Sequence, residues 1–151
     1  MAYEIYEANY LEEELLVIGI DERGGFLGEE LVRSLHEISP LRVTFVSAIL
    51  DRAEGIPSIG MDLSIEIEQL ENRPIVVVDD VLYSGSTLLN VVAILFQSKP
   101  KTIQTAVLID RGHRMMPISP DFVGLELATT LQQHVSVEIV PKENKAEAYL
   151  L

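Results

Sequence analysis

The stretch Pro74–Thr87, PIVVVDDVLYSGST, joins an apolar run, two adjacent carboxylates and a loop of small residues. Ile75–Val78 consists of β-branched residues and does not alternate with polar residues, which predicts a strand buried on both faces of a parallel sheet. The pair Asp79–Asp80 would stand at the carboxyl end of this strand, where open α/β sheets bind ligands. Ser84–Thr87 then leads into a predicted helix, Leu88–Ser98, whose free N–H groups and dipole favour an anion. The stretch therefore predicts a sugar-phosphate site.

The segments around this stretch predict an α/β fold. Leu27–Ile38 carries apolar residues at helical spacing, and Pro40 marks the end of that helix. Met61–Ile67 alternates apolar and polar residues, as a half-exposed antiparallel strand does. Further buried strands are expected at Leu15–Ile20, Leu41–Leu50 and Ile103–Ile109. The order of strands and helices predicts a mainly parallel sheet flanked by helices.

The two ends of the chain follow different patterns. Tyr3–Glu14 is expected to form a short acidic helix with its three tyrosines on one packing face. The carboxyl third predicts short strands at Asp121–Leu127 and Val135–Val140, without a further crossover helix, and Ala146–Leu151 is expected either as an edge strand or free. With 151 residues, the whole span 1–151 is expected to be a single domain.

Composition excludes several classes of protein. The chain has 11 Lys and Arg against 24 Asp and Glu, a net charge of −13, so general RNA or DNA binding is not expected. It has no cysteine, which removes disulfide and thiolate chemistry. The amino terminus lacks a signal-peptide pattern, and no apolar run approaches the ~20 residues of a membrane span. We therefore expect a cytoplasmic protein without a membrane segment.

Pro74–Thr87 resembles the phosphoribosyl pyrophosphate (PRPP) motif of type I phosphoribosyltransferases, in which four apolar residues precede two acids and a Thr-Gly-x-Thr loop. The resemblance implies that fold, with a small carboxyl-terminal hood. It also implies that Asp79 and Asp80 hold the ribose hydroxyls and Mg²⁺, and that they belong to the catalytic set. The loop would wrap the 5-phosphate, which makes the PRPP-binding residues Asp79, Asp80, Val81, Leu82, Tyr83, Ser84, Gly85, Ser86 and Thr87. A P-loop site is excluded, because no G-x-x-x-x-G-K-[ST] occurs.

The loop Asp21–Gly25, which precedes the Leu27–Ile38 helix, resembles the pyrophosphate loop of the same family. Its two glycines allow the backbone to approach a ligand, and Arg23 has the geometry to pair with phosphate oxygens. Pyrophosphate binding is therefore expected at Glu22, Arg23, Gly24, Gly25 and the distant Arg111, with Arg23 also catalytic. If the loop holds a non-proline cis peptide, as relatives often do, we expect it at Glu22–Arg23. The acids Asp21 and Glu22 depart from the family pattern.

Leu108–Leu127, LIDRGHRMMPISPDFVGLEL, resembles the bacterial pyrimidine-operon regulator and uracil phosphoribosyltransferase (PyrR-type) family. Uracil is therefore the first choice of base and a purine the second. The hood residues His134, Val135 and Ser136 are expected to contact the base, although no aromatic residue is there to stack on it. Relatives commonly form dimers, so we expect a homodimer or a higher homo-oligomer.

The lid is the main departure from active relatives, which carry a long mobile loop before the PRPP strand. Here the matching piece is only Asp51–Gly60, with Arg52 as its sole basic residue. An incomplete lid weakens water exclusion, on which this class of transfer depends. The sequence thus leaves two functions open: a phosphoribosyltransferase that uses PRPP, Mg²⁺ and a nucleobase or nucleoside monophosphate, or a regulator that senses the nucleotide without turnover. RNA attenuation is disfavoured by the negative charge.

Overall fold

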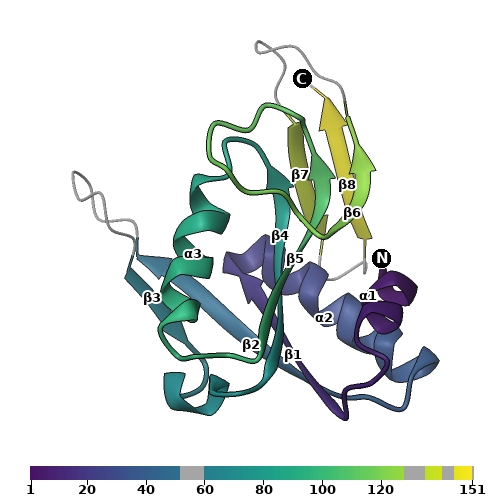
Figure 1. Ribbon diagram of the computed structural model, residues 1–151. Helices are drawn as coiled ribbons and strands as arrows, with labels where there is room; N and C mark the ends of the chain where they lie inside the picture. Colours follow the sequence, from purple (N-terminus) through teal and green to yellow (C-terminus); the bar gives the residue numbers. More distant parts are fainter. Residues whose placement is uncertain (52–59, 128–134, 141–144, 151) are drawn as a thin grey trace.

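The computed structural model describes residues 1–51, 60–127, 135–140 and 145–150 (Figure 1). Its helices are α1 (Ala2–Ala8), α2 (Asp21–Ile38), the 3-10 turn η1 (Ile67–Leu70) and α3 (Ser86–Phe96). Its strands are β1 (Glu14–Ile20), β2 (Arg42–Asp51), β3 (Gly60–Leu63), β4 (Pro74–Leu82), β5 (Thr102–Asp110), β6 (Phe122–Glu126), β7 (Val135–Val140) and β8 (Lys145–Leu150).

Six strands form one sheet in the order β3-β2-β1-β4-β5-β6. Every neighbouring pair is parallel except β2 and β3, which are antiparallel. The predicted mainly parallel sheet is confirmed. The antiparallel strand expected at Met61–Ile67 is present but shorter, because it ends at Leu63 and η1 begins at Ile67; it lies at the edge of the sheet. Strands β7 and β8 form a separate antiparallel pair near the carboxyl terminus, so the last predicted segment is a paired strand (Figure 1).

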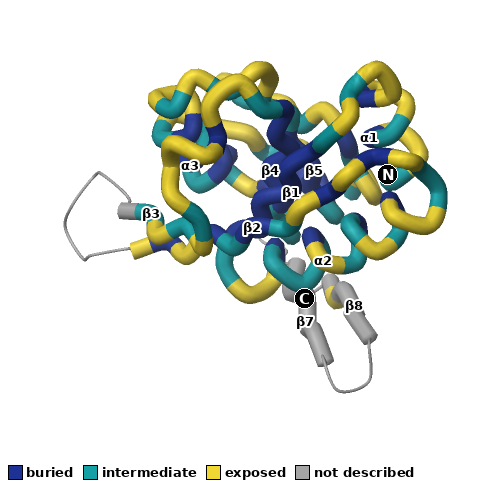
Figure 2. The backbone as a smooth tube through the Cα atoms, turned by 90° about the horizontal axis from the view of Figure 1, so that it is seen from below, coloured by how far each residue is buried: buried dark blue, intermediate teal, exposed yellow. Residues whose placement is uncertain are grey.

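The sheet has a hydrophobic core on each face, because alternate residues of a strand point to opposite sides. On β4, Ile75 and Val77 belong to the core under α3, whereas Val76 and Val78 belong to the core under α1 and α2. All four side chains are fully buried, as the non-alternating sequence predicted. Figure 2 shows this buried centre along β1, β4 and β5, with the helices on either side.

Helix α2 begins earlier than the sequence predicted. Residues 21–25 were expected to form a loop, but Asp21 already starts the helix and has a positive φ of 51°. The glycines explain the difference: a Cβ on Gly24 would lie 2.6 Å from the Val78 carbonyl oxygen, and one on Gly28 would lie 2.9 Å from Phe45 Cε2. They let α2 pack closely on the sheet rather than forming a turn. No cis peptide bond occurs among the described residues.

The amino-terminal prediction was only partly correct. Helix α1 ends at Ala8 rather than Glu14, and its inward residue is the fully buried Ile5. Tyr3 and Tyr10 are exposed at 72% and 65%, so they do not form the expected packing face. In the described part of the chain, no helix combines the length and hydropathy that crossing a membrane requires.

Candidate functional site

The adjacent carboxylates of Asp79 and Asp80 on β4 point to opposite faces of the sheet. Asp80 follows Val78 in the alternation and faces α2, where its Oδ2 lies 3.5 Å from Arg23 Nη1. Asp79 follows Val77 and faces the side of α3. Each carboxylate also accepts a bond from the next backbone amide, Asp80 N–H to Asp79 Oδ1 at 2.9 Å and Val81 N–H to Asp80 Oδ1 at 2.8 Å. The pair is thereby held in fixed directions at the carboxyl edge of the sheet.

Asp79 has the one resolved pKa shift among the described residues. Burial raises the pKa of its carboxyl to about 7, and the charges of Asp80 and Asp21 act in the same direction. The bond from the Asp80 amide opposes the shift but does not cancel it. Near neutral pH the Asp79 carboxyl is therefore partly protonated, and a bound cation would displace its proton.

Asp79 lies where two hollows meet. The first, which we call the α2 hollow, has a volume of about 290 Å³ and is lined by Ile20, Asp21, Glu22, Arg23, Asp79 and Asp80. The second, the α3 hollow, has a volume of about 180 Å³ and is lined by Asp79 and most of the segment Val81–Leu88. Helices α2 and α3 begin beside these hollows, so each hollow faces a helix amino terminus.

The loop Ser84–Thr87, which we call the phosphate loop, forms the start of α3. Gly85 is the N-cap residue with a φ of 84°, and no side chain caps the helix. The hydroxyls of Ser84 and Ser86 lie 2.9 Å apart, and the Ser86 amide donates to Ser84 Oγ at 3.3 Å. Gly85 has no side chain to cap the first turn, and apart from the Ser86 amide its N–H groups, beside these hydroxyls, are suited to an anion such as a phosphate.

The α2 hollow is more acidic than a pyrophosphate site requires. Glu22 and Arg23 line it as predicted, but Arg23 is 54% exposed and leans toward Asp80. Asp21 Oδ1 accepts a hydrogen bond from the Leu50 amide at 2.9 Å, so this acid also ties α2 to the end of β2. Gly24 is buried against β4. Gly25 packs against Gly19 of β1, since a Cβ on Gly19 would lie 2.6 Å from Gly25 Cα. Gly24 and Gly19 therefore leave no room for a side chain, whereas a Cβ on Gly25 would meet only Phe45 Cζ at 4.0 Å. The sequence pattern had not indicated this packing requirement.

Arg111 was predicted to bind pyrophosphate together with Arg23, but the two arginines line different hollows. Arg111 is 4% exposed and lines another hollow, of about 220 Å³, at the ends of β5 and β6. Its guanidinium lies over the ring of Tyr83, 4.6 Å from the centroid. Arg111 is not among the described residues that line the α2 hollow. Asp110, Glu126 and Leu127 line the hollow of Arg111, and the sequence interpretation had assigned them no role.

Some predicted site residues lie outside the described residues. The expected lid, Asp51–Gly60, falls almost wholly within residues 52–59, and His134 lies within 128–134. For Val135 and Ser136 the structure describes only the backbone, at the start of β7.

The two adjacent carboxylates suit Mg²⁺, which proteins bind through one or two carboxylates while water and substrate oxygens complete the octahedron. Among the described residues, no group of three or more His, Cys, Asp or Glu is arranged to hold a metal ion alone. Asp79 and Asp80 would therefore hold the ion together with a ligand that supplies the other oxygens.

Comparison with known proteins identifies the family of this chain from its sequence, and solved structures share its fold. The model of the phosphoribosyl transferase domain matches residues 1–141. The bifunctional protein PyrR of Clostridium kluyveri is 35% identical over 159 residues, which cover 99% of this chain and 88% of that protein. The protein of the same name from Brevibacillus brevis is 36% identical over 148 residues, covering 92% of this chain and 81% of that one.

Solved structures share the fold at low identity. The hypoxanthine phosphoribosyltransferase of Trypanosoma cruzi, solved with the product IMP, has a TM-score of 0.76 and 20% identity, covering 89% of this chain and 74% of that one. A hypoxanthine-guanine phosphoribosyltransferase of Bacillus anthracis has a TM-score of 0.72 and 19% identity, covering 89% and 76%.

Proposed function

The chain belongs to the phosphoribosyltransferase family, with PyrR proteins among its relatives, and from that premise we propose that it binds PRPP with Mg²⁺ and transfers the phosphoribosyl group to a nucleobase. Uracil is the first choice of base and a purine the second. The observation that carries the proposal is the position of Asp79 between two hollows at helix amino termini. PRPP carries its two anionic groups at opposite ends of a ribose, which matches this arrangement.

In the proposed complex, the phosphate loop binds the 5-phosphate through its amides and hydroxyls. Asp79 and Asp80 accept hydrogen bonds from the ribose hydroxyls and hold Mg²⁺, which supplies positive charge to the pyrophosphate. Glu22 and Arg23 line the hollow on the pyrophosphate side, where Arg23 stabilises the negative charge that develops there. Gly24 and Gly25 follow them in the first turn of α2 and would contribute through their backbone. A base nitrogen then forms a bond to C1 of the ribose while the bond from C1 to pyrophosphate breaks, and the base loses its N–H proton.

The base has two candidate positions. The first is the hood, through His134, Val135 and Ser136. The second is the hollow of Asp110, Arg111 and Glu126, because its carboxylates and guanidinium offer the acceptors and donors that match the N–H and carbonyl groups of a pyrimidine ring. Glu126→Gln, tested by the concentration of base at half-maximal rate, distinguishes the two, since only the second position predicts an increase; Asp110 is unsuitable because it also holds Arg114.

The alternative function is a regulator that binds PRPP or a nucleotide without turnover. The acidic α2 hollow favours it: Asp21, Glu22, Asp79 and Asp80 line the hollow, and among its described lining residues Arg23 is the only cation. Acids there raise the energy of charge building on the leaving group. A homodimer or higher homo-oligomer also belongs to the proposal, because a neighbouring subunit would be able to supply a basic side chain or a lid. The span 1–151 would act as one domain.

The test is a scan of uracil, hypoxanthine, guanine and xanthine with PRPP and Mg²⁺, followed by pyrophosphate release. Turnover on the order of one per second with any base identifies an enzyme and removes the regulatory alternative. Binding of PRPP without release of pyrophosphate with all four bases supports the regulator. Release that persists in Asp80→Asn would contradict the proposed site.

A further inference from the structure

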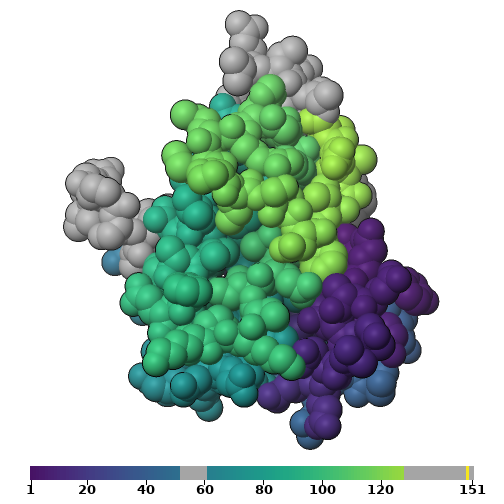
Figure 3. Space-filling model, in the orientation of Figure 1, coloured from purple at the N-terminus to yellow at the C-terminus, as the bar shows by residue number. Residues whose placement is uncertain are grey.

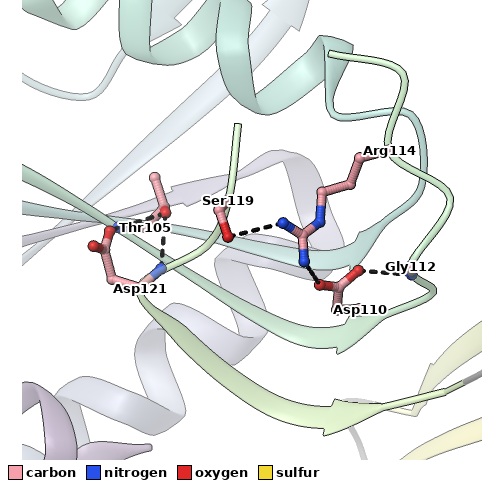
Figure 4. Close-up of polar contacts among 6 residues, drawn as sticks. All are labelled: Thr105, Asp110, Gly112, Arg114, Ser119 and Asp121. Atoms are coloured by element: carbon pink, nitrogen blue, oxygen red, sulfur yellow. Dashed lines mark hydrogen bonds and ion pairs between the residues drawn. The ribbon is translucent and has the colours of Figure 1, made fainter. Parts of the chain in front are cut away.

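The segment Asp110–Ser119, which we call the strap, is closed on itself by one arginine (Figure 4). Asp110 is 4% exposed, and its carboxylate accepts bonds from the Gly112 amide at 2.9 Å and from Arg114 Nη2 at 2.8 Å. The other nitrogen of the same guanidinium, Arg114 Nη1, donates to Ser119 Oγ at 2.8 Å. Arg114 therefore joins the buried start of the strap to its far end.

The closed strap lies directly against the phosphate loop. The carbonyl oxygen of Ser84 accepts hydrogen bonds from two strap amides, Met115 at 2.9 Å and Met116 at 3.0 Å. Ile118 covers the next residue, since a Cβ on Gly85 would lie 2.7 Å from Ile118 Cγ2. The strap thus fixes both the peptide before Gly85 and the space over it. Figure 1 shows the strap at the same end of the sheet as the start of α3, and in Figure 3 the green atoms of this part of the chain lie on the surface at the upper end of the described molecule.

A second connection runs along the strand end. The Arg111 amide donates to the Leu82 carbonyl at 3.2 Å, and the Arg111 guanidinium lies over Tyr83. The residues just before the phosphate loop are therefore also held by the start of the strap. The orientation of the Ser84 carbonyl fixes the direction of the Gly85 N–H, because both groups belong to one planar peptide unit. The later amides of the loop follow from that starting direction and from the φ of 84° at Gly85.

We propose that Arg114 is a positioning residue for the phosphate loop: by bridging Asp110 and Ser119 it holds the Met115 and Met116 amides on the Ser84 carbonyl and so sets the direction of the loop amides. The inference rests on the proposed function, in which this loop binds a 5-phosphate. The bridge requires a guanidinium, because its planar fork donates to two acceptors at once, whereas the ammonium of lysine is a compact point charge.

The variants separate this role from a general loss of stability. Arg114→Met removes both bonds, Ser119→Ala removes one of them at an exposed position, and Arg114→Lys retains the charge next to Asp110. Arg33→Met is the matched control, because Arg33 is an exposed arginine paired with Glu30 on α2 at 2.6 Å. Thermal midpoints are recorded for all four, so that changes in the loop are compared at known stability.

The first readout is calorimetric binding of ribose 5-phosphate, PRPP with Mg²⁺, and uridine monophosphate. Arg114→Met should weaken ribose 5-phosphate and PRPP by a similar factor, about tenfold, because both carry the ribose 5-phosphate. It should weaken uridine monophosphate by at least that factor, since Arg114 also lines the hollow that is the second candidate position of the base. Ser119→Ala and Arg114→Lys should give smaller losses, and Arg33→Met none. A loss confined to uridine monophosphate would overturn the proposal, since Arg114 would then contact the base directly.

The second readout needs no ligand. Hydrogen exchange at the Met115 and Met116 amides and in residues 82–88 should be faster in Arg114→Met and, to a smaller extent, in Ser119→Ala, while exchange in β1 stays unchanged. Unchanged exchange in the loop overturns the positioning role, even if the parent binds all three ligands. If the parent binds none of them, the proposed function fails, and the exchange result alone decides whether Arg114 orders the loop. If Arg114→Met does not fold, Ser119→Ala decides both readouts.

Discussion

Asp21 Oδ1 accepts a hydrogen bond from the Leu50 backbone amide at 2.9 Å, although the two residues are 29 positions apart. The bond joins the first residue of α2 to the end of β2. Asp21 also has a φ of 51°, a region in which Asp and Asn are tolerated better than other side chains. The acid that departs from the family pattern therefore has a structural role as well as a charge in the α2 hollow.

Replacing Asp21 should separate these two roles. Asp21→Asn retains the acceptor and the tolerance of positive φ, so the free energy of unfolding should change little. Asp21→Ala loses both, at a cost of about 2 kcal/mol. Urea unfolding measures the difference. Because Asp21→Asn also removes a negative charge from the α2 hollow, it should tighten PRPP binding; equal losses of stability in both variants would show that the Leu50 bond is unimportant.

The raised pKa of Asp79 should appear in the dependence of stability on pH. Between 3.8 and about 7, folded Asp79 retains a proton that the unfolded chain has lost, so this residue lowers stability as pH rises through that window, by up to about 1.4 kcal/mol per pH unit. Asp79→Asn mimics the protonated carboxyl. Without divalent cations, its gain in stability over the parent should grow by about 2 to 3 kcal/mol from pH 5 to pH 8.

The exposed Asp62→Asn serves as the control for that experiment. The same urea titrations are made with this variant, so that the effect of losing one surface carboxylate is subtracted. A constant difference for Asp79→Asn would then mean that the Asp79 carboxyl is already ionised at pH 5 in the folded protein.

Gly85 and Gly112 form a matched pair for the phosphate loop, since both have positive φ, 84° and 71°. A Cβ at Gly112 would meet nothing within 4 Å, whereas one at Gly85 would lie 2.7 Å from Ile118. Gly112→Ala should therefore cost about 1 kcal/mol, and Gly85→Ala about 3 kcal/mol because of the added overlap. PRPP binding should be lost only in Gly85→Ala. Equal effects of the two changes on stability and binding would refute the contact between strap and loop.

RNA binding is not expected at physiological salt. The 24 Asp and Glu residues outnumber the 11 Lys and Arg residues, and the net negative charge repels a polyanion. Arg114, a cation of the DRGHR segment, binds Asp110 and Ser119 within the protein. A gel-shift titration with a leader RNA of a pyrimidine operon, at about 0.15 M salt, tests this. Salt-sensitive binding at submicromolar protein would contradict the expectation.

Local sequence patterns predicted the sheet and the core of the site because they depend on strong periodicity. The unbroken apolar run at Ile75–Val78 is a fully buried strand, and Asp79 meets the phosphate loop around the α3 hollow, whereas Asp80 faces the α2 hollow. The start of α2 was missed because Gly24 and Gly25 were interpreted as turn residues. For Gly24 the actual requirement is tertiary, since it packs against Val78 on a strand more than 50 residues away. The spacing of Gly24 and Gly28, one helical turn, was the available signal.

The contacts of the strap could not be predicted in the same way. Ser84 bonds to the amides of Met115 and Met116, and backbone groups leave no trace in a sequence. Arg111 was assigned to pyrophosphate because it is basic and near a strand end, but the direction of its side chain depends on the position of Tyr83. The four-residue spacing of Asp110 and Arg114 was the one local indication of the bridge.

The central claim is that Asp79, Asp80 and the phosphate loop bind PRPP with Mg²⁺, and isothermal titration calorimetry tests it most directly. The parent and Asp62→Asn should give a saturable heat for PRPP in the presence of Mg²⁺, and removing Mg²⁺ should weaken it. Asp80→Asn, which loses a carboxylate charge and the contact with Arg23, should abolish that heat while the protein stays folded. No heat in the parent, or an undiminished affinity in Asp80→Asn, would contradict the claim.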